Sequence, residues 1–181
     1  MRTRFILLLV IGLSLGTTPH ARAWDLSVPS DADTLVQTYF NPAFGPFDTF
    51  TPPKNDKKSW DIQNYGVFFL NIYCSSEKYL VLTRYQKWND ESSVWDTIAF
   101  PKSTNLSLKF GNSKAISWGT KLENDINGIV ISNPKLFVKK ITSVKTLEYP
   151  VKIEGTTYKV KFNTAGFRSF LPDLKDAGCS G

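Results

Sequence analysis

The chain has 181 residues, of which 41% are hydrophobic and 14% aromatic, and this supports a single domain with its own core. Lysine and arginine outnumber aspartate and glutamate by 22 to 16, so the formal net charge is +6. After the first few residues no apolar run is long enough for a transmembrane helix, which excludes an integral helical membrane protein.

Residues 1–23 are predicted to be a secretory signal peptide. Two arginines precede an uncharged apolar run from Phe5 to Leu15, and Ala21 and Ala23 occupy the two positions that a signal peptidase reads. An uncleaved membrane anchor is the alternative, but this run is too short to cross about 30 Å of hydrocarbon. We therefore expect cleavage after Ala23, no stable membrane insertion, and a periplasmic or secreted bacterial protein.

Cleavage would change what the composition implies. The three arginines of residues 1–23 would leave, which lowers the formal net charge from +6 to +3 and weakens the case for nucleic-acid binding. The only histidine, His20, would leave as well. Without histidine the chain can build neither a Ser-His-Asp nor a Cys-His catalytic unit, so we expect no cofactor, no metal and no enzymatic activity.

The two cysteines, Cys74 and Cys179, are expected to form a disulfide, because this is the default pairing in an oxidising compartment. A bond between them would close a long loop and stabilise the fold by on the order of 4–5 kcal/mol in the loop-entropy model. A reactive or metal-binding thiol is the alternative, and it would lack a histidine partner.

Residues 24–60 form a weakly patterned, loop-rich start of one domain that spans residues 24–181. Asp33-Thr34 is predicted to cap a short helix that ends at Phe40, since the apolar residues between them share one side. Four prolines then predict a loop over residues 42–58, because proline removes a backbone donor.

From Tyr65 the apolar residues follow strand spacing. Strands are predicted over residues 65–74, 79–88, 94–100, 106–110, 115–122 and 129–131. Polar turns separate them, and residues 89–92 make a hairpin connection. Trp88 and Trp95 flank this connection and are expected to pair across the strands, with a sugar-binding platform as the alternative. Strands at this spacing predict a mainly β fold, either a β-sandwich or a bent antiparallel sheet.

The remaining chain is predicted to form a helix, two strands and a second helix. A helix near residues 134–144 would be capped by Asn133, with Pro134 at its first position. Two strands follow on either side of a turn at Glu154-Gly155. A short C-terminal helix near residues 164–177 would be capped by Asn163 or Thr164.

Pro172 falls inside this last helix. A proline in a helix interior costs about 3 kcal/mol, so we expect a kinked or two-piece helix in which Pro172 lies in the first turn of the second piece. Gly178 suits the left-handed position after the helix and leads directly to Cys179.

The second half of the chain carries a cluster of lysines between residues 135 and 161, where there are only two acids, Glu148 and Glu154. These residues form the candidate interaction surface: Lys135, Lys139, Lys140, Lys145, Lys152, Lys159 and Lys161. A solvated polar face is one interpretation. A docking patch for another protein or for an anionic envelope polymer is the other.

Catalysis by other groups finds little support. Asp90 and Glu91 are neighbours in sequence and are interpreted as turn residues, because adjacent side chains diverge and make poor glycosidase partners. Pairs of serine and lysine occur, but there is no phosphate-binding loop and no EF-hand pattern. No catalytic residue is therefore assigned.

Residues 64–179, and in particular Phe162-Asn163-Thr164-Ala165-Gly166-Phe167 before a short helix and Cys179, resemble the C-terminal half of two families of small secreted bacterial proteins. These are the VasI-like proteins associated with type VI secretion and the invasion-associated locus B proteins. Both resemble this chain in having a β-rich domain with a strand-borne cysteine, a Phe-x-x-x-Gly segment and a short helix leading to cysteine. The locus B pattern carries more cysteines, and Pro172 interrupts the expected helix. The resemblance implies an accessory or binding role and no catalytic site.

The sequence thus predicts a non-enzymatic periplasmic or secreted binding protein that serves a secretion or envelope system. One alternative is an immunity protein or inhibitor of a toxin or wall hydrolase. The other is a carboxylate-based hydrolase.

Overall fold

The computed structural model describes residues 25–27, 34–42, 45–47, 64–100, 105–123 and 128–179. The predicted signal peptide and most of the predicted loop after residue 47 lie outside these ranges. Among the helices within them, none has the length and apolar character needed to cross a membrane.

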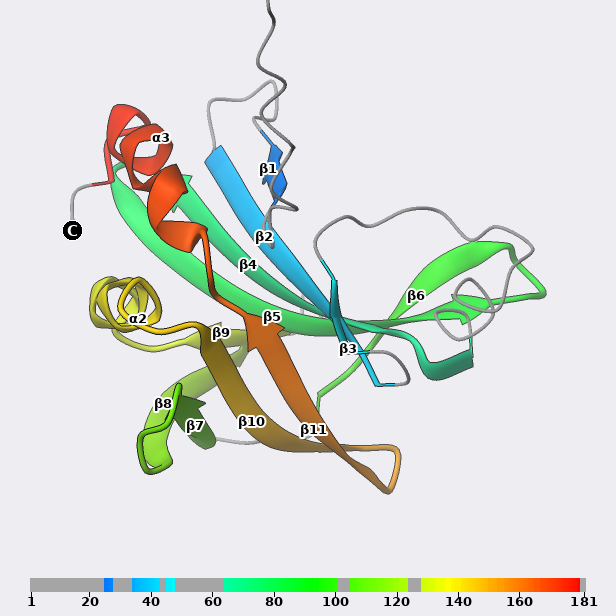
Figure 1. Cartoon of the computed structure of the whole chain (residues 1–181). Helices are drawn as coiled ribbons and strands as arrows, with labels where there is room; N and C mark the ends of the chain where they lie inside the picture. Colours follow the sequence, from blue (N-terminus) through cyan, green and yellow to red (C-terminus); the bar gives the residue numbers. More distant parts are fainter. Residues whose placement is uncertain are drawn as a thin grey trace, which may run out of the picture.

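The described strands form one antiparallel sheet. They are β1 (Asp25–Ser27), β2 (Thr34–Asn41), β3 (Gly45–Phe47), β4 (Val67–Ser75), β5 (Lys78–Asn89), β6 (Val94–Ile98), β7 (Asn105–Phe110), β8 (Ile116–Glu123), β9 (Gly128–Ile131), β10 (Thr146–Ile153) and β11 (Thr156–Asn163). Their order is β1-β2-β4-β5-β9-β8-β7-β10-β11, with β3 beside β2 and β6 beside β5. The sheet bends until β11 returns towards β2 and β3, so it is nearly closed (Figure 1). The predicted mainly β fold is confirmed, as a bent antiparallel sheet.

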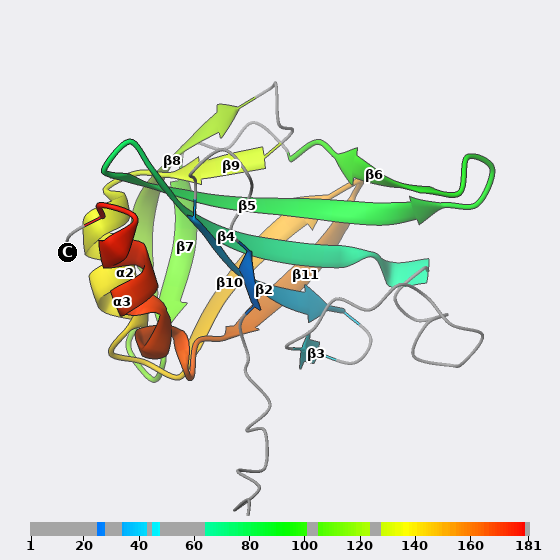
Figure 2. The same cartoon turned by 90° about the horizontal axis from the view of Figure 1, so that it is seen from above.

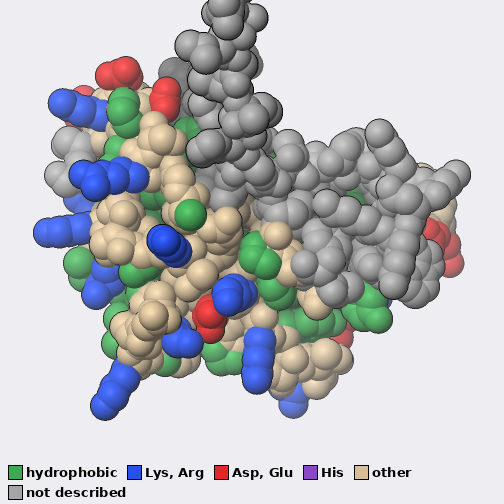
Figure 3. Space-filling view, in the orientation of Figure 1, with side chains coloured by type: hydrophobic (Ala, Val, Ile, Leu, Met, Phe, Trp, Pro, Cys, Tyr) green, Lys and Arg blue, Asp and Glu red, His purple; other side chains and the backbone are tan. Residues whose placement is uncertain are grey.

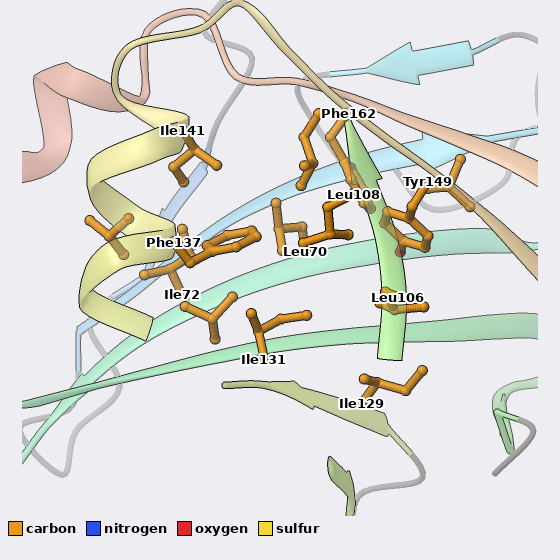
Figure 4. Close-up of a cluster of buried hydrophobic side chains, with 14 of the residues drawn as sticks. Leu70, Ile72, Leu106, Leu108, Ile129, Ile131, Phe137, Ile141, Tyr149 and Phe162 are labelled. Atoms are coloured by element: carbon orange, nitrogen blue, oxygen red, sulfur yellow. The ribbon is translucent and has the colours of Figure 1, made fainter. Parts of the chain in front are cut away.

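The core fills the inside of this bent sheet. On β7, β10 and most of β11, buried side chains alternate with more exposed ones, as the period of two requires. On β7, for example, Leu106 and Leu108 are buried, whereas Ser107 between them is exposed. Figure 4 shows Leu108 beside Leu70 of β4, with the ring of Phe137 from α2 (Pro134–Ile141) directed towards them, so the helix closes one end of the same core.

The helix predicted near residues 134–144 is confirmed as α2, but its predicted cap is wrong. Asn133 has φ 52° and ψ 56°, in the left-handed region, and its side chain makes no capping hydrogen bond. A capping side chain needs an extended backbone to reach the first free N–H groups, and the left-handed backbone removes that geometry. Pro134 does occupy the start of the helix, as expected.

The C-terminal helix is in two pieces. A 3-10 turn, η2 (Phe167–Phe170), precedes α3 (Leu171–Asp176), and Pro172 lies in the first turn of α3, as predicted. Neither Asn163 nor Thr164 is the cap, because the chain first turns through Gly166, which has φ 85°. Asn163 instead accepts a hydrogen bond from the Ala165 N–H.

The N-terminal prediction is wrong in two places. The segment from Thr34 to Asn41, expected to contain a helix, is strand β2 and pairs with β1, β3 and β4. Its apolar residues suit either period, and pairing with β4 over most of its length decides in favour of a strand. Part of the predicted loop, Gly45–Phe47, is strand β3.

The predicted disulfide is confirmed. Cys74 near the end of β4 is bonded to Cys179, with 5.8 Å between their Cα atoms. The Tyr79 hydroxyl donates to the Cys179 carbonyl at 3.2 Å, and Gly178 before it has φ 93°. α2 and α3 lie together at one end of the sheet, and the disulfide fastens α3 there (Figure 2).

Candidate functional site

The candidate site is the outward face of β7, β10 and β11. The inward positions of these strands hold core residues, so the residues between them point outward. On β10 the outward positions include Glu148, Pro150 and Lys152, and on β11 they include Lys159 and Lys161.

Glu148 lies at the centre of this face. It is the register partner of Lys109 on β7 and also of Lys161 on β11. One carboxylate oxygen is 3.4 Å from the Lys109 Nζ, and the other is 3.4 Å from the Lys161 Nζ. All three side chains retain contact with solvent, so each ion pair contributes about 0–1 kcal/mol to stability. Their main effect is to order the two ammonium groups across the strands.

Two further lysines of the face have no acidic partner among the described residues. Lys159 is opposite Pro150, and Lys152 is opposite Thr157. We call Lys109, Lys152, Lys159 and Lys161, arranged around Glu148, the lysine face. Four lysines against one glutamate give it a formal net charge of +3.

A hollow of about 540 Å³ opens on the lysine face. Its lining combines charged, polar and apolar groups from three strands and the segment before β8: Ser107, Lys109, Ala115, Glu148, Tyr149, Pro150, Lys159, Val160 and Lys161. Ordered ammonium groups beside a partly apolar hollow suit a partner that carries negative charge on a polypeptide surface.

The structure divides the seven lysines of the predicted surface into two groups. Lys152, Lys159 and Lys161 belong to the lysine face. Lys135, Lys139 and Lys140 are on α2, and Lys140 lies over the Phe110 ring with its Nζ 5.6 Å from the ring centre. Lys145 is exposed in the connection between α2 and β10. Figure 3 shows the basic side chains spread over the region of α2, β10 and β11 rather than gathered in one cluster.

Sequence reasoning missed Lys109, which lies outside the lysine-rich segment. Alternation along residues 106–110 places it on the outward side of its strand. Its neighbour Glu148 is 39 positions away in sequence, and only the pairing of β7 with β10 brings them together.

The β5–β6 hairpin carries the other candidates. Asp90 and Glu91 are exposed turn residues, as predicted. Trp88 and Trp95 pair across the strands, as expected, with ring centres 5.6 Å apart in an edge-to-face arrangement. In the part of the chain that the structure describes, no group of three or more histidine, cysteine or carboxylate side chains is placed to hold a metal ion.

Three tyrosines inside the fold have shifted acidities. Burial raises the pKa of Tyr149 and of Tyr79. Burial also raises the pKa of Tyr85, with smaller contributions from Tyr158 and Glu154. All three therefore stay neutral at physiological pH and serve as structural donors rather than as acids or bases.

No protein-family model matches the chain, and neither a curated protein nor a solved structure shows significant similarity to it.

Proposed function

We propose that this chain is a non-enzymatic binding protein of the bacterial periplasm or exterior, an accessory component of a secretion or envelope system. It docks an acidic partner protein on the lysine face. The observation that carries the proposal is the set of four outward lysines around Glu148, beside a hollow of about 540 Å³.

The composition of the face favours a protein partner over a uniform anionic polymer. Glu148 stands in its centre, so a polymer with a negative charge on every unit would place one of those charges against the Glu148 carboxylate. A protein surface can place acidic groups against Lys152 and Lys159 and a donor against Glu148. The apolar lining of the hollow, which includes Pro150 and Ala115, also suits a polypeptide.

The disulfide supports the proposed location in the periplasm or outside the cell. Cys74 and Cys179 are bonded, and the described residues contain no free cysteine. A structural disulfide between distant parts of a chain is typical of proteins that fold under oxidising conditions. This agrees with the predicted signal peptide.

Affinity capture with matched variants tests the proposal. The full sequence, with a C-terminal tag, is expressed, purified and incubated with an envelope extract of the source bacterium. We expect one acidic protein to be retained by the wild type and lost by the variant Lys152→Glu/Lys159→Glu. Reversing these two charges should weaken binding at least tenfold, since it turns two attractions into repulsions.

The control is Lys135→Glu/Lys139→Glu, which makes the same change of charge on exposed residues of α2. It should retain the captured protein at the wild-type level. Equal loss of the captured protein with both variants would show that its retention depends on net charge and not on the lysine face. Retention by the variant of the lysine face would contradict the proposed docking surface.

A further inference from the structure

The hydrogen-bond ladder between β7 and β10 is short. Only two residue pairs join the strands, Leu147 with Phe110 and Glu148 with Lys109, although both strands continue. Just before these pairs the Gly111 N–H donates to the Thr146 carbonyl at 2.8 Å. Opposed pairs of an antiparallel ladder alternate between bonded and non-bonded, so Lys109 and Glu148 form the next bonded pair.

The missing N–H of Pro150 explains why the ladder stops. The following bonded pair would be Ser107 with Pro150, but proline has no N–H to donate. The Ser107 carbonyl therefore has no donor at that position of β10. Ser107 and Pro150 are not register partners, and the two strands have no register partners with each other beyond them. The two strands separate here, and both Ser107 and Pro150 line the hollow.

The backbone of β10 beyond this point faces the gap. Its pairing with β11 is complete, from Thr146–Asn163 to Ile153–Thr156. Lys145 accepts a hydrogen bond from the Thr164 N–H at 2.9 Å, so by alternation the odd-numbered residues of β10 are those bonded to β11. The N–H and C=O of Lys152 consequently point away from β11. On the side away from β11, none of the described strands pairs with β10 at this position.

We infer that an extended acidic segment of the partner adds to the edge of β10 at Lys152, as an extra strand in the gap that Pro150 keeps open. The Lys152 N–H and C=O and the carbonyls of Pro150 and Ser107 supply the main-chain contacts. Lys152 and Lys159 receive its acidic side chains. This mode of binding rests on the proposed function and specifies how the lysine face would recognise its partner.

Recognition of an acidic strand needs both the free main-chain groups of β10 and the lysine side chains. A strand edge alone accepts any extended chain, and lysines on an edge normally discourage such pairing. Here Lys152 selects a strand whose outward side chains are acidic, because opposite charges on neighbouring strands attract. Lys159, one strand further on β11, adds positive charge to the same face. An anionic polymer without peptide N–H groups could use the lysines but could not donate to the Ser107 carbonyl.

Peptide titration followed by NMR tests the inference. The probe is a short blocked peptide in which threonine and glutamate alternate, and its matched control is N-methylated at alternate residues. The wild-type chain should bind the first peptide, with the largest amide shift at Lys152, and bind the methylated peptide at least tenfold more weakly. Pro150→Ala, which restores the missing N–H and lets the ladder close, should also weaken binding about tenfold.

Pro172→Ala, an exposed proline in α3, is the control for proline replacement and should bind as the wild type does. Equal binding of the two peptides, or no effect of Pro150→Ala, would overturn strand addition while leaving docking on the lysine face intact. Absence of peptide binding, or tighter binding of inorganic polyphosphate than of the peptide, would also overturn it. Failure of the capture experiment alone would instead count against the proposed function.

Discussion

The Tyr149 hydroxyl on β10 and the Thr83 hydroxyl on β5 are hydrogen-bonded to each other inside the sheet, 66 positions apart in sequence. Thr83 also donates to the Phe69 carbonyl on β4 at 2.9 Å. A hydroxyl has one hydrogen, so Tyr149 must be the donor to Thr83. Because both side chains are buried, this chain of hydrogen bonds ties the strand beneath the lysine face to the centre of the sheet.

Replacing Tyr149 by Phe should destabilise the fold. The ring would still fill its place, but Thr83 would lose its donor, at a cost of about 1 kcal/mol in the free energy of unfolding. For a domain of this size that corresponds to a fall in Tm of about 2–4 °C, measured by calorimetry. Tyr65→Phe, at a side chain that is 45% exposed, should change Tm very little. An unchanged Tm in Tyr149→Phe would show that the hydrogen bond contributes nothing.

Stability should fall at alkaline pH. Burial raises the pKa of Tyr149 and Tyr85 in the folded state above the ordinary value of 10.0. Above pH 10 the unfolded chain therefore loses these protons while the folded chain keeps them. Each tyrosine then lowers the free energy of unfolding by about 1.4 kcal/mol per pH unit, and below pH 10 its contribution is constant. Urea titrations between about pH 9 and about pH 11.5 should show a smaller slope in Tyr149→Phe than in the wild type.

The disulfide should carry a large part of the stability. Cys74 and Cys179 are 105 positions apart, and the loop-entropy model gives about 4–5 kcal/mol for such a crosslink. Cys74→Ala/Cys179→Ala should therefore unfold at a much lower urea concentration than the wild type. Adding reductant should shift the wild type towards the variant and leave the variant unchanged. A wild-type midpoint that does not respond to complete reduction would contradict this role.

Glu148 should act on selectivity more than on stability. Its ion pairs with Lys109 and Lys161 are partly exposed, so Glu148→Gln should change the free energy of unfolding by less than about 1 kcal/mol. The same change removes the central negative charge and raises the net charge of the lysine face from +3 to +4. Binding of inorganic polyphosphate, measured by calorimetric titration, should then become tighter than in the wild type. Unchanged polyphosphate binding would show that Glu148 does not exclude polyanions.

Local patterns predicted much of this fold because local chemistry determines those elements. The Glu154-Gly155 turn forms with positive φ at both residues, 48° and 85°, which is the geometry of a tight hairpin. Pro172 fixes the break between η2 and α3 for the same kind of reason, since proline is tolerated only at the start of a helix.

The features that sequence patterns did not predict depend on contacts between residues distant in sequence. The residues of β2 fit a helical stripe as well as a strand, and only β4 decides between them. Asn133 has the side chain of a capping residue, but the turn that leads from β9 into α2 gives it a left-handed backbone. The lysine face depends on three strands, and the importance of Pro150 becomes visible only when the register of β7 and β10 is continued past Glu148 to Ser107.

The most direct measurement of the central claim is the affinity of the purified captured partner for three forms of the chain. These are the wild type, Lys152→Glu/Lys159→Glu on the lysine face, and Lys135→Glu/Lys139→Glu on α2. The account predicts that the Kd rises at least tenfold in Lys152→Glu/Lys159→Glu and less than about twofold in Lys135→Glu/Lys139→Glu. For the wild type, the Kd should rise with increasing salt. Equal affinity of the wild type and the lysine-face variant would contradict it.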